Sequence, residues 1–319
     1  MTYRELLEEG VRVLTNAFRE NASAETREGI EDDARELLRF AAGITYARYL
    51  AVRDHEASPE ETALFREAVR RRAGFEPVQY ITGEQVFMGF PFAVTPAVLI
   101  PRADTECLAE TVLEWLRERT GKPSPAEKTQ VPGAPAGSEK PFLRGLDLCC
   151  GSGCLAISIA LMAAEKVRMD ASDLSEKALE VARKNASALL SDGCGVTFRQ
   201  GDLFDALPQN REKYDFIVSN PPYIATETIR QLDPTVASFE PALALDGGED
   251  GLVFYRRIAF EAPRFLRPGG RLFLEIGEDQ GRAVSAILEN AGFRGIVCRR
   301  DYAGRDRVIT AEYPETNGE

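Results

Sequence analysis

The most specific chemical pattern in the sequence is the segment Asn220-Pro221-Pro222-Tyr223, which comes one residue after the apolar run Phe216-Ile217-Val218. Two adjacent prolines fix φ and remove two N–H donors, so the nearby carbonyls stay free and their directions are set. The Asn220 side chain supplies one acceptor and two donors, and Tyr223 supplies a flat face on which a planar group can stack. A strand that ends in this way presents fixed acceptors beside an aromatic ring.

These groups suit an amide or amidine nitrogen, which is a poor nucleophile because its lone pair is delocalised. The nitrogen becomes usable when its two N–H bonds point at the Asn220 side-chain oxygen and the Pro221 carbonyl. Those acceptors hold it in line with a methyl sulfonium and stabilise the positive charge that develops during transfer. No strong base is needed. This agrees with the presence of a single histidine, His55, which we expect to be solvated near a helix end.

A second pattern lies upstream, in the turn from Asp147 to Gly153 (DLCCGSG). Glycines at a strand-to-helix turn let the backbone approach a ligand, and the helix N-terminus offers free N–H groups. Asp173 lies 20 residues past Gly153 and can accept the two ribose hydroxyls of a bound adenosine. Taken alone, the turn is also a common connection and Asp173 also suits a cap for the helix entered at Ser175. A nicotinamide dinucleotide would fit these two features equally well.

Alternating strands and helices are predicted to position both patterns. We expect strands at FLRGLDLCC, VRMDASD, VTFRQGD, YDFIVSN and GRLFLEIG with helices between them, then two antiparallel strands joined by a turn at Gly304. This alternation predicts an α/β fold with a doubly wound, mostly parallel, seven-stranded sheet. Ligands of such sheets bind at the carboxyl ends of the strands, where both patterns lie.

Residues 1 to about 75 are predicted to form a small helical bundle, because their apolar residues recur at helical spacing. One helix is expected to begin with Ser58 as cap, Pro59 in the first turn and Glu61 completing a capping box. Gly74 is expected to end it. The bundle contains no catalytic constellation of its own, so we expect it to recognise a partner.

Between the bundle and the sheet, residues 76–103 are predicted to be a linker built on a β-hairpin. Its strands are placed at QYIT and VFM, on either side of a turn at Gly83. A helix capped by Asp104 or Thr105 should follow, to about Arg119. Residues 121–141 contain five prolines and three glycines without apolar periodicity and predict a mobile surface loop.

Taken together, these motifs resemble one family. SNPPY after an apolar strand, with DLxxGSG upstream, resembles the class I methyltransferases that act on exocyclic or amide nitrogens. The segments QYITGEQVFMGFPFAVTPAVLIPRADTE, GDLF, SNPPYI and FEPALALDGGEDGLVFYRRI are together similar to the release-factor glutamine methyltransferases, the PrmC/HemK family. The match covers nearly the whole chain apart from residues 121–141 and a small insertion around 191–195.

The resemblance implies a helical domain (1–75), a hairpin linker (76–103) and a Rossmann-like methyltransferase domain (104–319). It implies S-adenosylmethionine as cofactor and class 1 peptide-chain release factors as partners, methylated on the side-chain amide N5 of their Gly-Gly-Gln glutamine. By position, the cofactor contacts fall on Cys149, Cys150, Gly151, Ser152, Gly153, Asp173, Leu203 and Asn220. The substrate contacts fall on Asn220, Pro221, Pro222 and Tyr223, of which Asn220, Pro221 and Tyr223 are implied to be catalytic.

Two residues depart from the family pattern. Cys149 stands where the family usually has glycine, and a positive φ there would strain a side chain by about 1–3 kcal/mol. We therefore expect an ordinary φ at Cys149, with the sulfur packed inward. Leu203 stands where an aromatic residue often flanks the adenine, so plain apolar contact should replace stacking.

Composition excludes several classes. The net charge is −12 and the pI about 4.9, which argues against a nucleic-acid substrate held through phosphates and suits a basic protein partner. No apolar run approaches the ~18 residues of a membrane span, and the N-terminus lacks a secretory layout, so the cytoplasm is expected. The six cysteines form no CxxC pair and predict free buried thiols rather than a metal site.

Three alternatives stay open at this point. A nucleic-acid adenine N6-methyltransferase shares the Asn-Pro-Pro-Tyr chemistry, but it needs a basic surface to hold a flipped base. Here residues 1–78 carry 12 basic and 16 acidic residues. A ribosomal-protein glutamine methyltransferase would use the same chemistry on another partner. A binding module that has lost catalysis is suggested by Cys149 and opposed by the intact Asn220–Tyr223 segment.

Overall fold

A computed structural model describes residues 1–20, 26–121, 142–163, 166–191, 195–208 and 212–315. The chain forms two compact units. The first comprises Met1–Glu84, Val94–Pro96 and Arg230–Glu240, and the second comprises Gln85–Ala93, Ala97–Ile229 and Pro241–Glu319. From residue 122 on, the loop predicted at 121–141 lies outside the described residues, and Gly121 ends a helix.

The first unit is helical. Its helices are α1 (Tyr3–Glu20), α2 (Arg27–Ala42), α3 (Tyr46–Val52), α4 (Pro59–Ala73) and α5 (Val78–Thr82). A separate apolar core that includes Leu6, Leu14 and Phe18 joins them. As predicted, α4 begins with a capping box between Ser58 and Glu61 and ends at Gly74. This unit therefore carries its own core and its own helix signals.

The hairpin lies slightly later in the chain than predicted. Its strands are β1 (Glu84–Phe87) and β2 (Phe90–Ala93), whereas the segment expected as its first strand is the helix α5. The α5 helix ends at Gly83, which adopts φ 79° and donates its N–H to the Gln79 carbonyl. A short apolar run fits a strand and a helical turn equally well. A left-handed glycine after it indicates the end of a helix.

The second unit is built on a seven-stranded sheet in the order β5-β4-β3-β6-β7-β9-β8, as the alternation predicted. All neighbours pair in parallel except β9, which is antiparallel to both β7 and β8. The strands are β3 (Leu143–Leu148), β4 (Val167–Asp173), β5 (Val196–Gln200), β6 (Tyr214–Ser219), β7 (Leu266–Glu275), β8 (Arg294–Arg300) and β9 (Asp306–Glu312).

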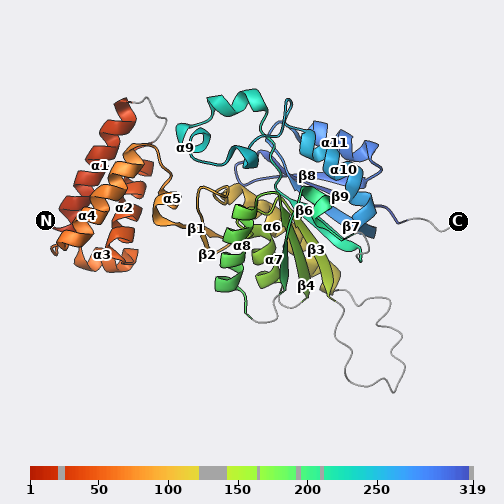
Figure 1. Cartoon of the computed structure of the whole chain (residues 1–319), viewed down its shortest axis with the longest axis horizontal. Coiled ribbons are helices and arrows are strands. Elements are labelled where there is room, and N and C mark those ends of the chain that lie inside the picture. The colour runs from red at the N-terminus through yellow and green to blue at the C-terminus, as the bar shows by residue number, and fades with distance from the viewer. Residues whose placement is uncertain (21–25, 122–141, 164–165, 192–194, 209–211, 316–319) are drawn as a thin grey trace, which may run out of the picture. The chain divides into compact units, whose positions relative to one another are not determined.

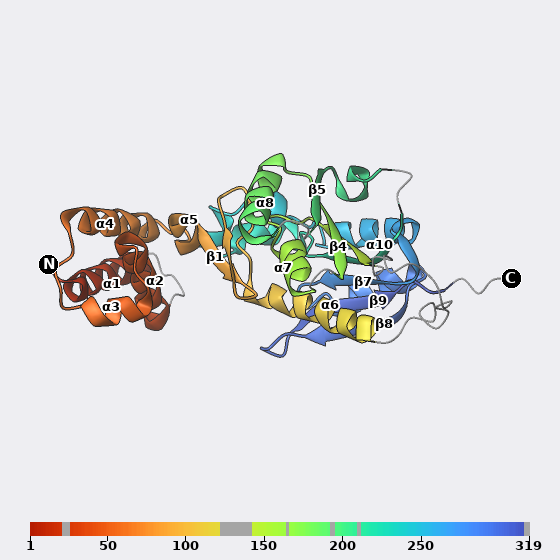
Figure 2. The same ribbon diagram turned by 90° about the horizontal axis from the view of Figure 1, so that it is seen from below.

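Helices cover both faces of this sheet. The main ones are α6 (Ala103–Gly121), α7 (Cys154–Met162), α8 (Glu176–Leu189), α10 (Val253–Phe265) and α11 (Gly281–Asn290). Short helices complete the unit or join its strands: η2 (Leu203–Ala206), η3 (Thr226–Gln231), α9 (Pro234–Ala237) and η4 (Ala242–Ala244). Figure 1 shows α7 and α8 on one side of the sheet and α10 and α11 on the other. In Figure 2, α6 runs beside β7 and β9.

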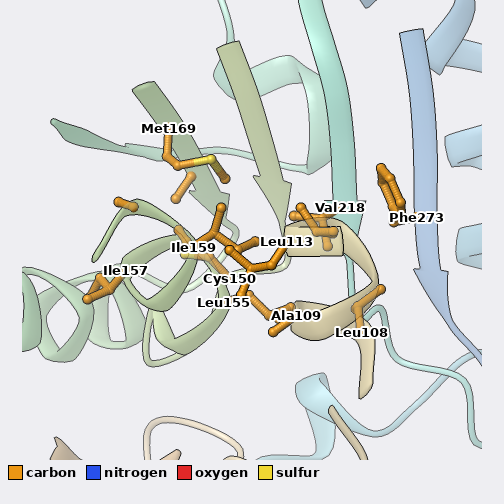
Figure 3. Close-up of a cluster of buried hydrophobic side chains, with 14 of the residues drawn as sticks. Leu108, Ala109, Leu113, Cys150, Leu155, Ile157, Ile159, Met169, Val218 and Phe273 are labelled. Atoms are coloured by element: carbon orange, nitrogen blue, oxygen red, sulfur yellow. The ribbon is translucent and has the colours of Figure 1, made fainter. Parts of the chain in front are cut away.

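Alternate residues of each strand separate two apolar cores. Met169, Val218 and Phe273 point toward α6 and α7, where they pack with Leu113 and Leu155 (Figure 3). Strand residues on the opposite face, among them Leu148, Ile217 and Leu274, pack against α10 and α11. Since side chains in a strand alternate between faces, this pattern places the strand ends rigidly between two packed layers. The loops at the carboxyl ends of β3, β4 and β6 are thereby held in place.

Candidate functional site

A pocket of about 200 Å³ opens at the carboxyl ends of β3, β4 and β6. The predicted site residues that line it are Cys149, Cys150, Gly151, Ser152, Asp173, Leu203, Asn220 and Pro222. Gly153, Pro221 and Tyr223 adjoin lining residues in the chain. The structure thus brings together residues that are more than 70 positions apart in the sequence.

The turn between β3 and α7 has left-handed backbone at three positions. Cys149 has φ 59°, Gly151 φ 53° and Gly153 φ 78°. The expectation of ordinary φ at Cys149 is wrong. Strand β3 ends at Leu148, and the N–H of Cys150 still donates to the Ser172 carbonyl of β4 at 3.0 Å. The chain therefore turns away from the sheet at Cys149, between these two positions. A left-handed conformation costs an L-residue roughly 1–2 kcal/mol.

The Cys149 side chain offsets part of this strain. It is half-buried and packs against the core on the α10 face, as the inward-packing prediction implies. Burial raises the pKa of its thiol, and burial also raises the pKa of Cys150 and of Cys154. All three thiols are therefore neutral and poorly nucleophilic at physiological pH. The prediction that the cysteines are buried is wrong for Cys298, which is exposed.

Asp173 joins the turn to the end of β4. Its Oδ2 accepts the Gly151 N–H at 2.9 Å, and its Oδ1 accepts the Ser175 N–H at 2.9 Å. The alternative interpretation of Asp173 as the cap of α8 is wrong, because the N-cap is Ser175, whose Oγ accepts the Ala178 N–H at 3.2 Å. Asp173 holds the backbone of that cap residue and lines the pocket. Burial raises the pKa of Asp173, while the backbone N–H bonds lower it. Each carboxylate oxygen keeps a lone pair for a further donor.

Asp147 links strand β3 to the first turn of α7. It is fully buried in β3, and its Oδ2 accepts the Ala156 N–H of α7 at 3.1 Å. Burial raises its pKa well above the ordinary value, although the Ala156 bond lowers it. Within the described part of the chain its Oδ1 has no hydrogen-bond partner. The sequence motif contained Asp147, but no separate function was predicted for it.

The segment after β6 presents Asn220 to the pocket in a defined orientation. The Nδ2 of Asn220 donates to the Thr105 hydroxyl of α6 at 3.2 Å. Neither the Asn220 Oδ1 nor the Pro221 carbonyl is hydrogen-bonded to another described residue. The two acceptors that the sequence singled out are therefore open, while the amide nitrogen of Asn220 is engaged.

A glycine-rich loop, residues 245–251, packs against the backbone of Tyr223 and Ile224. Ile224 donates its N–H to Leu245 and accepts from Gly247 at 2.8 Å, which forms an isolated parallel bridge. A Cβ on Gly247 would lie 2.8 Å from the Tyr223 Cα, and one on Gly251 would lie 2.4 Å from the Tyr223 carbonyl oxygen. Only glycine permits this close approach. The motif LDGGEDG was quoted for the resemblance, but its supporting role was missed.

Gln280 completes the support. Its Nε2 donates to the Tyr223 carbonyl at 3.0 Å and to the Gly251 carbonyl at 3.3 Å. Its Oε1 accepts the Gly277 N–H at 2.9 Å. One side chain thus ties the Asn-Pro-Pro-Tyr segment to the glycine-rich loop and to the turn after β7. It lies 57 residues from Tyr223, and nothing in the local sequence around Gln280 indicates this contact.

Glu275 lies at the end of β7, directly beside the end of β6. It is 1% exposed, and the Tyr223 hydroxyl is 3.5 Å from its Oε1. Burial raises the pKa of Glu275 to about 7, against a hydrogen bond with Thr105 and the charge of Arg307, which both lower it. This buried carboxyl was missed by sequence analysis.

The far side of the pocket is apolar and partly charged. Leu203 is buried and has φ 51°, and its carbonyl accepts the Ser172 hydroxyl at 3.2 Å. Leu243 lines the pocket and is 51% exposed. Arg257 of α10 forms an ion pair with Asp202 at 2.9 Å beside it. This wall of the pocket therefore consists of apolar side chains beside an ion pair whose two charges offset each other.

Two further observations concern metal-binding groups and membrane-spanning helices. Among the described residues there is no group of three or more His, Cys, Asp or Glu side chains that could hold a metal ion. None of the described helices is long and apolar enough to cross a membrane.

Comparison with known proteins identifies related families and structures. Residues 5–83 match the family described as PrmC N-terminal domain, and residues 140–290 match a methyltransferase domain family. The catalytic domain of hMettl16, solved in complex with MAT2A 3'UTR hairpin 1, shares the fold with a TM-score of 0.50 and 16% identity, covering 81% of each chain.

Curated relatives are much closer in sequence. The release factor glutamine methyltransferase of Moorella thermoacetica is 41% identical over 312 residues, covering 98% of each chain. That of Cereibacter sphaeroides is 41% identical and covers 88% of this chain and 91% of its own. That of Clostridium acetobutylicum is 37% identical over 281 residues. With its N-terminal and methyltransferase regions both matched, the chain belongs to the release factor glutamine methyltransferase family.

Proposed function

We propose that this protein methylates the side-chain amide N5 of the glutamine in the Gly-Gly-Gln motif of class 1 peptide-chain release factors. The observation that carries the proposal is the pair of open acceptors beside the pocket, Asn220 Oδ1 and the Pro221 carbonyl. An amide NH₂ has two N–H bonds, and this pair can accept both. The partner also implies activity in the cytoplasm without direct contact to membrane or nucleic acid.

The methyl donor is S-adenosylmethionine, and the pocket residues fit it. Asp173 is a half-buried carboxylate whose two oxygens each have a lone pair free, which suits the two ribose hydroxyls. The turn from Cys149 to Gly153 brings backbone close to the pocket, and Leu203 supplies apolar surface for the adenine. When bound, S-adenosylmethionine supplies a methyl group on a sulfonium, and the C–S bonding pair leaves with the sulfur.

The residues of this chain act on the substrate by orientation. Asn220 and Pro221 accept the two N–H bonds, so the amide nitrogen is directed toward the transferred carbon and its growing charge is stabilised. The Tyr223 ring lies against the amide plane, and Pro222 fixes the backbone between them. As the N–C bond forms, the nitrogen becomes cationic. It then loses one proton to water, leaving N5-methylglutamine.

The decisive experiment is mass spectrometry of a class 1 release factor after incubation with the protein and S-adenosylmethionine. We expect a gain of one methyl group on the peptide that contains Gly-Gly-Gln. A release factor with alanine in place of that glutamine should gain none. Methylation of ribosomal protein or of adenine in nucleic acid instead, with the release factor unmodified, would overturn the substrate assignment.

The same assay tests Asn220. The variant Asn220→Ala removes the acceptor and should lower single-turnover methyl transfer by roughly 10²–10³-fold, comparable with losing one preorganised transition-state contact. Cofactor affinity should fall less, because Asp173 and the turn remain. A rate within about threefold of the unmodified protein would show that orientation by Asn220 does not drive the reaction.

The helical domain, residues 1–75, is proposed to recognise the protein partner. It has a separate apolar core, and the pocket lining lies entirely in the second unit. Hydrogen exchange of the full chain should show slower exchange in α1–α4 when release factor is added. S-adenosylmethionine alone should leave those amides unchanged. Protection confined to the second unit would assign partner recognition elsewhere.

A further inference from the structure

We propose that Glu275 is a positioning residue that acts through Thr105, and that the two together keep the oxygen of the Asn220 amide facing the substrate. The inference rests on the proposed function, because it explains how Asn220 comes to offer its oxygen. It concerns residues that lie outside the Asn-Pro-Pro-Tyr segment and more than 50 positions from it in the sequence.

An asparagine amide has nearly the same shape in both orientations, so something must select one. If the oxygen faces the pocket, it accepts a substrate N–H. If the NH₂ group faces the pocket, two donors meet two donors and the substrate is repelled. The apolar core beside β6 cannot choose between these orientations. Among the residues that the structure describes, the hydrogen bond that selects one orientation is the 3.2 Å bond from Asn220 Nδ2 to Thr105 Oγ1.

The Thr105 hydroxyl can accept from Asn220 or donate to it, and Glu275 decides which. The Oε2 of Glu275 is buried and has no other hydrogen-bond partner among the described residues, and a hydrogen bond with Thr105 lowers the pKa of Glu275. An ionised carboxylate is acceptor-only, so Thr105 is the donor in that bond and its lone pairs are left for the Asn220 nitrogen. Thr105 is 2% exposed and Glu275 is 1% exposed, so water does not compete. The charge on Glu275 thereby sets the direction of donation in the Thr105 hydroxyl, and the Thr105 hydroxyl sets the orientation of the Asn220 amide.

The fold explains why these groups meet. Ser219 of β6 pairs with Leu274 of β7, so Asn220 and Glu275 are the next residues on adjacent strands. Thr105 stands in the first turn of α6, which packs along β7. Tyr223 adds a second link, because its hydroxyl is 3.5 Å from Glu275 Oε1. Glu275 therefore contacts both ends of the Asn-Pro-Pro-Tyr segment, through Thr105 and through Tyr223.

The charge on Glu275 is set by groups from several elements. Those that face it are Asp104 and Thr105 of α6, Cys154 of α7, Tyr223 after β6, Tyr255 of α10 and Arg307 of β9. Arg307 is itself paired with Asp104 at 3.1 Å and with Asp301 at 3.2 Å, so its charge is only partly available to Glu275. Burial dominates and holds the pKa of Glu275 at about 7.

Protonation of Glu275 would turn it into a donor, leave the Thr105 hydroxyl free to donate to the Asn220 oxygen, and close that acceptor to the substrate. Methyl transfer should therefore increase as the pH rises through about 7. Between pH 6 and pH 8 the ionised fraction of such a group rises about tenfold. The rate of methyl transfer should increase by about the same factor over this range, which forms the acid limb of its pH profile.

The experiment measures single-turnover methyl transfer to a class 1 release factor from pH 6 to pH 8.5, with saturating S-adenosylmethionine, for Glu275→Gln, Thr105→Val and Thr105→Ser. We expect Glu275→Gln to lose the acid limb, with rates that vary less than about twofold, and to be slower than the unmodified protein at pH 8. Thr105→Val should be slower by about fivefold or more, and Thr105→Ser should recover most of that loss.

Two controls separate positioning from folding. Thr111→Val removes another buried hydroxyl of α6, which donates to the Cys107 carbonyl of its own helix, and should leave the rate and its pH profile unchanged. Calorimetry should give every variant an S-adenosylmethionine affinity within about threefold of the unmodified protein, which also shows that each one folds.

The outcomes distinguish the two proposals. An Asn220→Ala variant as fast as the unmodified protein would refute the proposed role of Asn220, and this inference with it. A slow Asn220→Ala variant beside a Glu275→Gln variant that keeps the full acid limb would refute the positioning role of Glu275 alone. Equal losses in Thr105→Ser and Thr105→Val would also refute it, because the hydroxyl would then not be the working group.

Discussion

Asp173 is the residue whose side chain connects the glycine turn with the end of β4. Both its oxygens accept backbone N–H groups, and both keep capacity for a diol. Replacement by alanine should weaken S-adenosylmethionine binding by roughly 1.5–3 kcal/mol, the range for hydrogen bonds to a charged group. Isothermal calorimetry measures this directly. Asp202→Ala is the matched control for a lost carboxylate at the pocket wall, and an equal loss in both variants would deny Asp173 its specific role.

Cys149 tests whether left-handed backbone is strained at the turn. With φ 59°, a glycine at this position relieves roughly 1–2 kcal/mol of strain, whereas alanine loses the sulfur and keeps the strain. Cys149→Gly should therefore be more stable than Cys149→Ala by about 1 kcal/mol, the reverse of the usual order of these two residues. Chemical denaturation measures both. If Cys149→Ala is the more stable variant, the turn does not store strain at this residue.

At the level of elements, the glycine-rich loop between η4 and α10 fixes the backbone position of the segment that follows β6. Gly251 has φ 70°, and a Cβ there would lie 2.4 Å from the Tyr223 carbonyl oxygen. Gly251→Ala must displace that carbonyl or the loop. Methyl transfer should fall by about tenfold or more, since small displacements of positioning groups have large effects on rate.

A matched variant isolates this steric effect. Gly304 in the β8–β9 turn also has positive φ, at 81°, but a Cβ there would meet nothing within 4 Å. Gly304→Ala should therefore cost about 1 kcal/mol of stability and leave methyl transfer unchanged. Both variants are compared by single-turnover rate and by thermal unfolding. Equal rates for the two would show that the loop does not position the Asn-Pro-Pro-Tyr segment.

For the whole molecule, Glu275 makes stability depend on pH. Its pKa is raised from 4.5 to about 7 by folding, so protonation favours the folded state. Its contribution is fully present below about pH 4.5 and is lost as the pH rises through about 7. Between pH 5.5 and pH 8 the loss amounts to about 2 kcal/mol of unfolding free energy.

Glu275→Gln cannot titrate and should lack this loss. The free energy of unfolding of the variant, relative to the unmodified protein, should therefore rise by about 2 kcal/mol from pH 5.5 to pH 8. Urea unfolding at the two pH values measures the change, and all other titrating groups cancel in the comparison. A difference that is independent of pH would mean that Glu275 does not titrate in this range.

Much of the architecture could be predicted because it is encoded locally. Strand β4 coincides with the predicted VRMDASD, and the capping box of α4 was predicted from four residues. The apolar runs are long enough to distinguish helix from strand, and their alternation implies a parallel sheet. Where a run was short, at Val78–Thr82, prediction failed: five residues fit either period, and packing within the helical unit selected a helix.

The sequence by itself determined the chemical groups and their order: a glycine turn, an acidic residue after the next strand, and Asn-Pro-Pro-Tyr after a buried one. Only the tertiary structure decided the backbone at Cys149 and which end of the Asn220 amide faces the pocket. The physical reason is that the conformation of Cys149 depends on contacts between strands, among them the hydrogen bond from the Cys150 N–H to Ser172 of β4, which the local sequence does not contain. Likewise, the Asn220 amide is oriented by Thr105, 115 residues away, which only the packing of α6 beside β7 brings within reach.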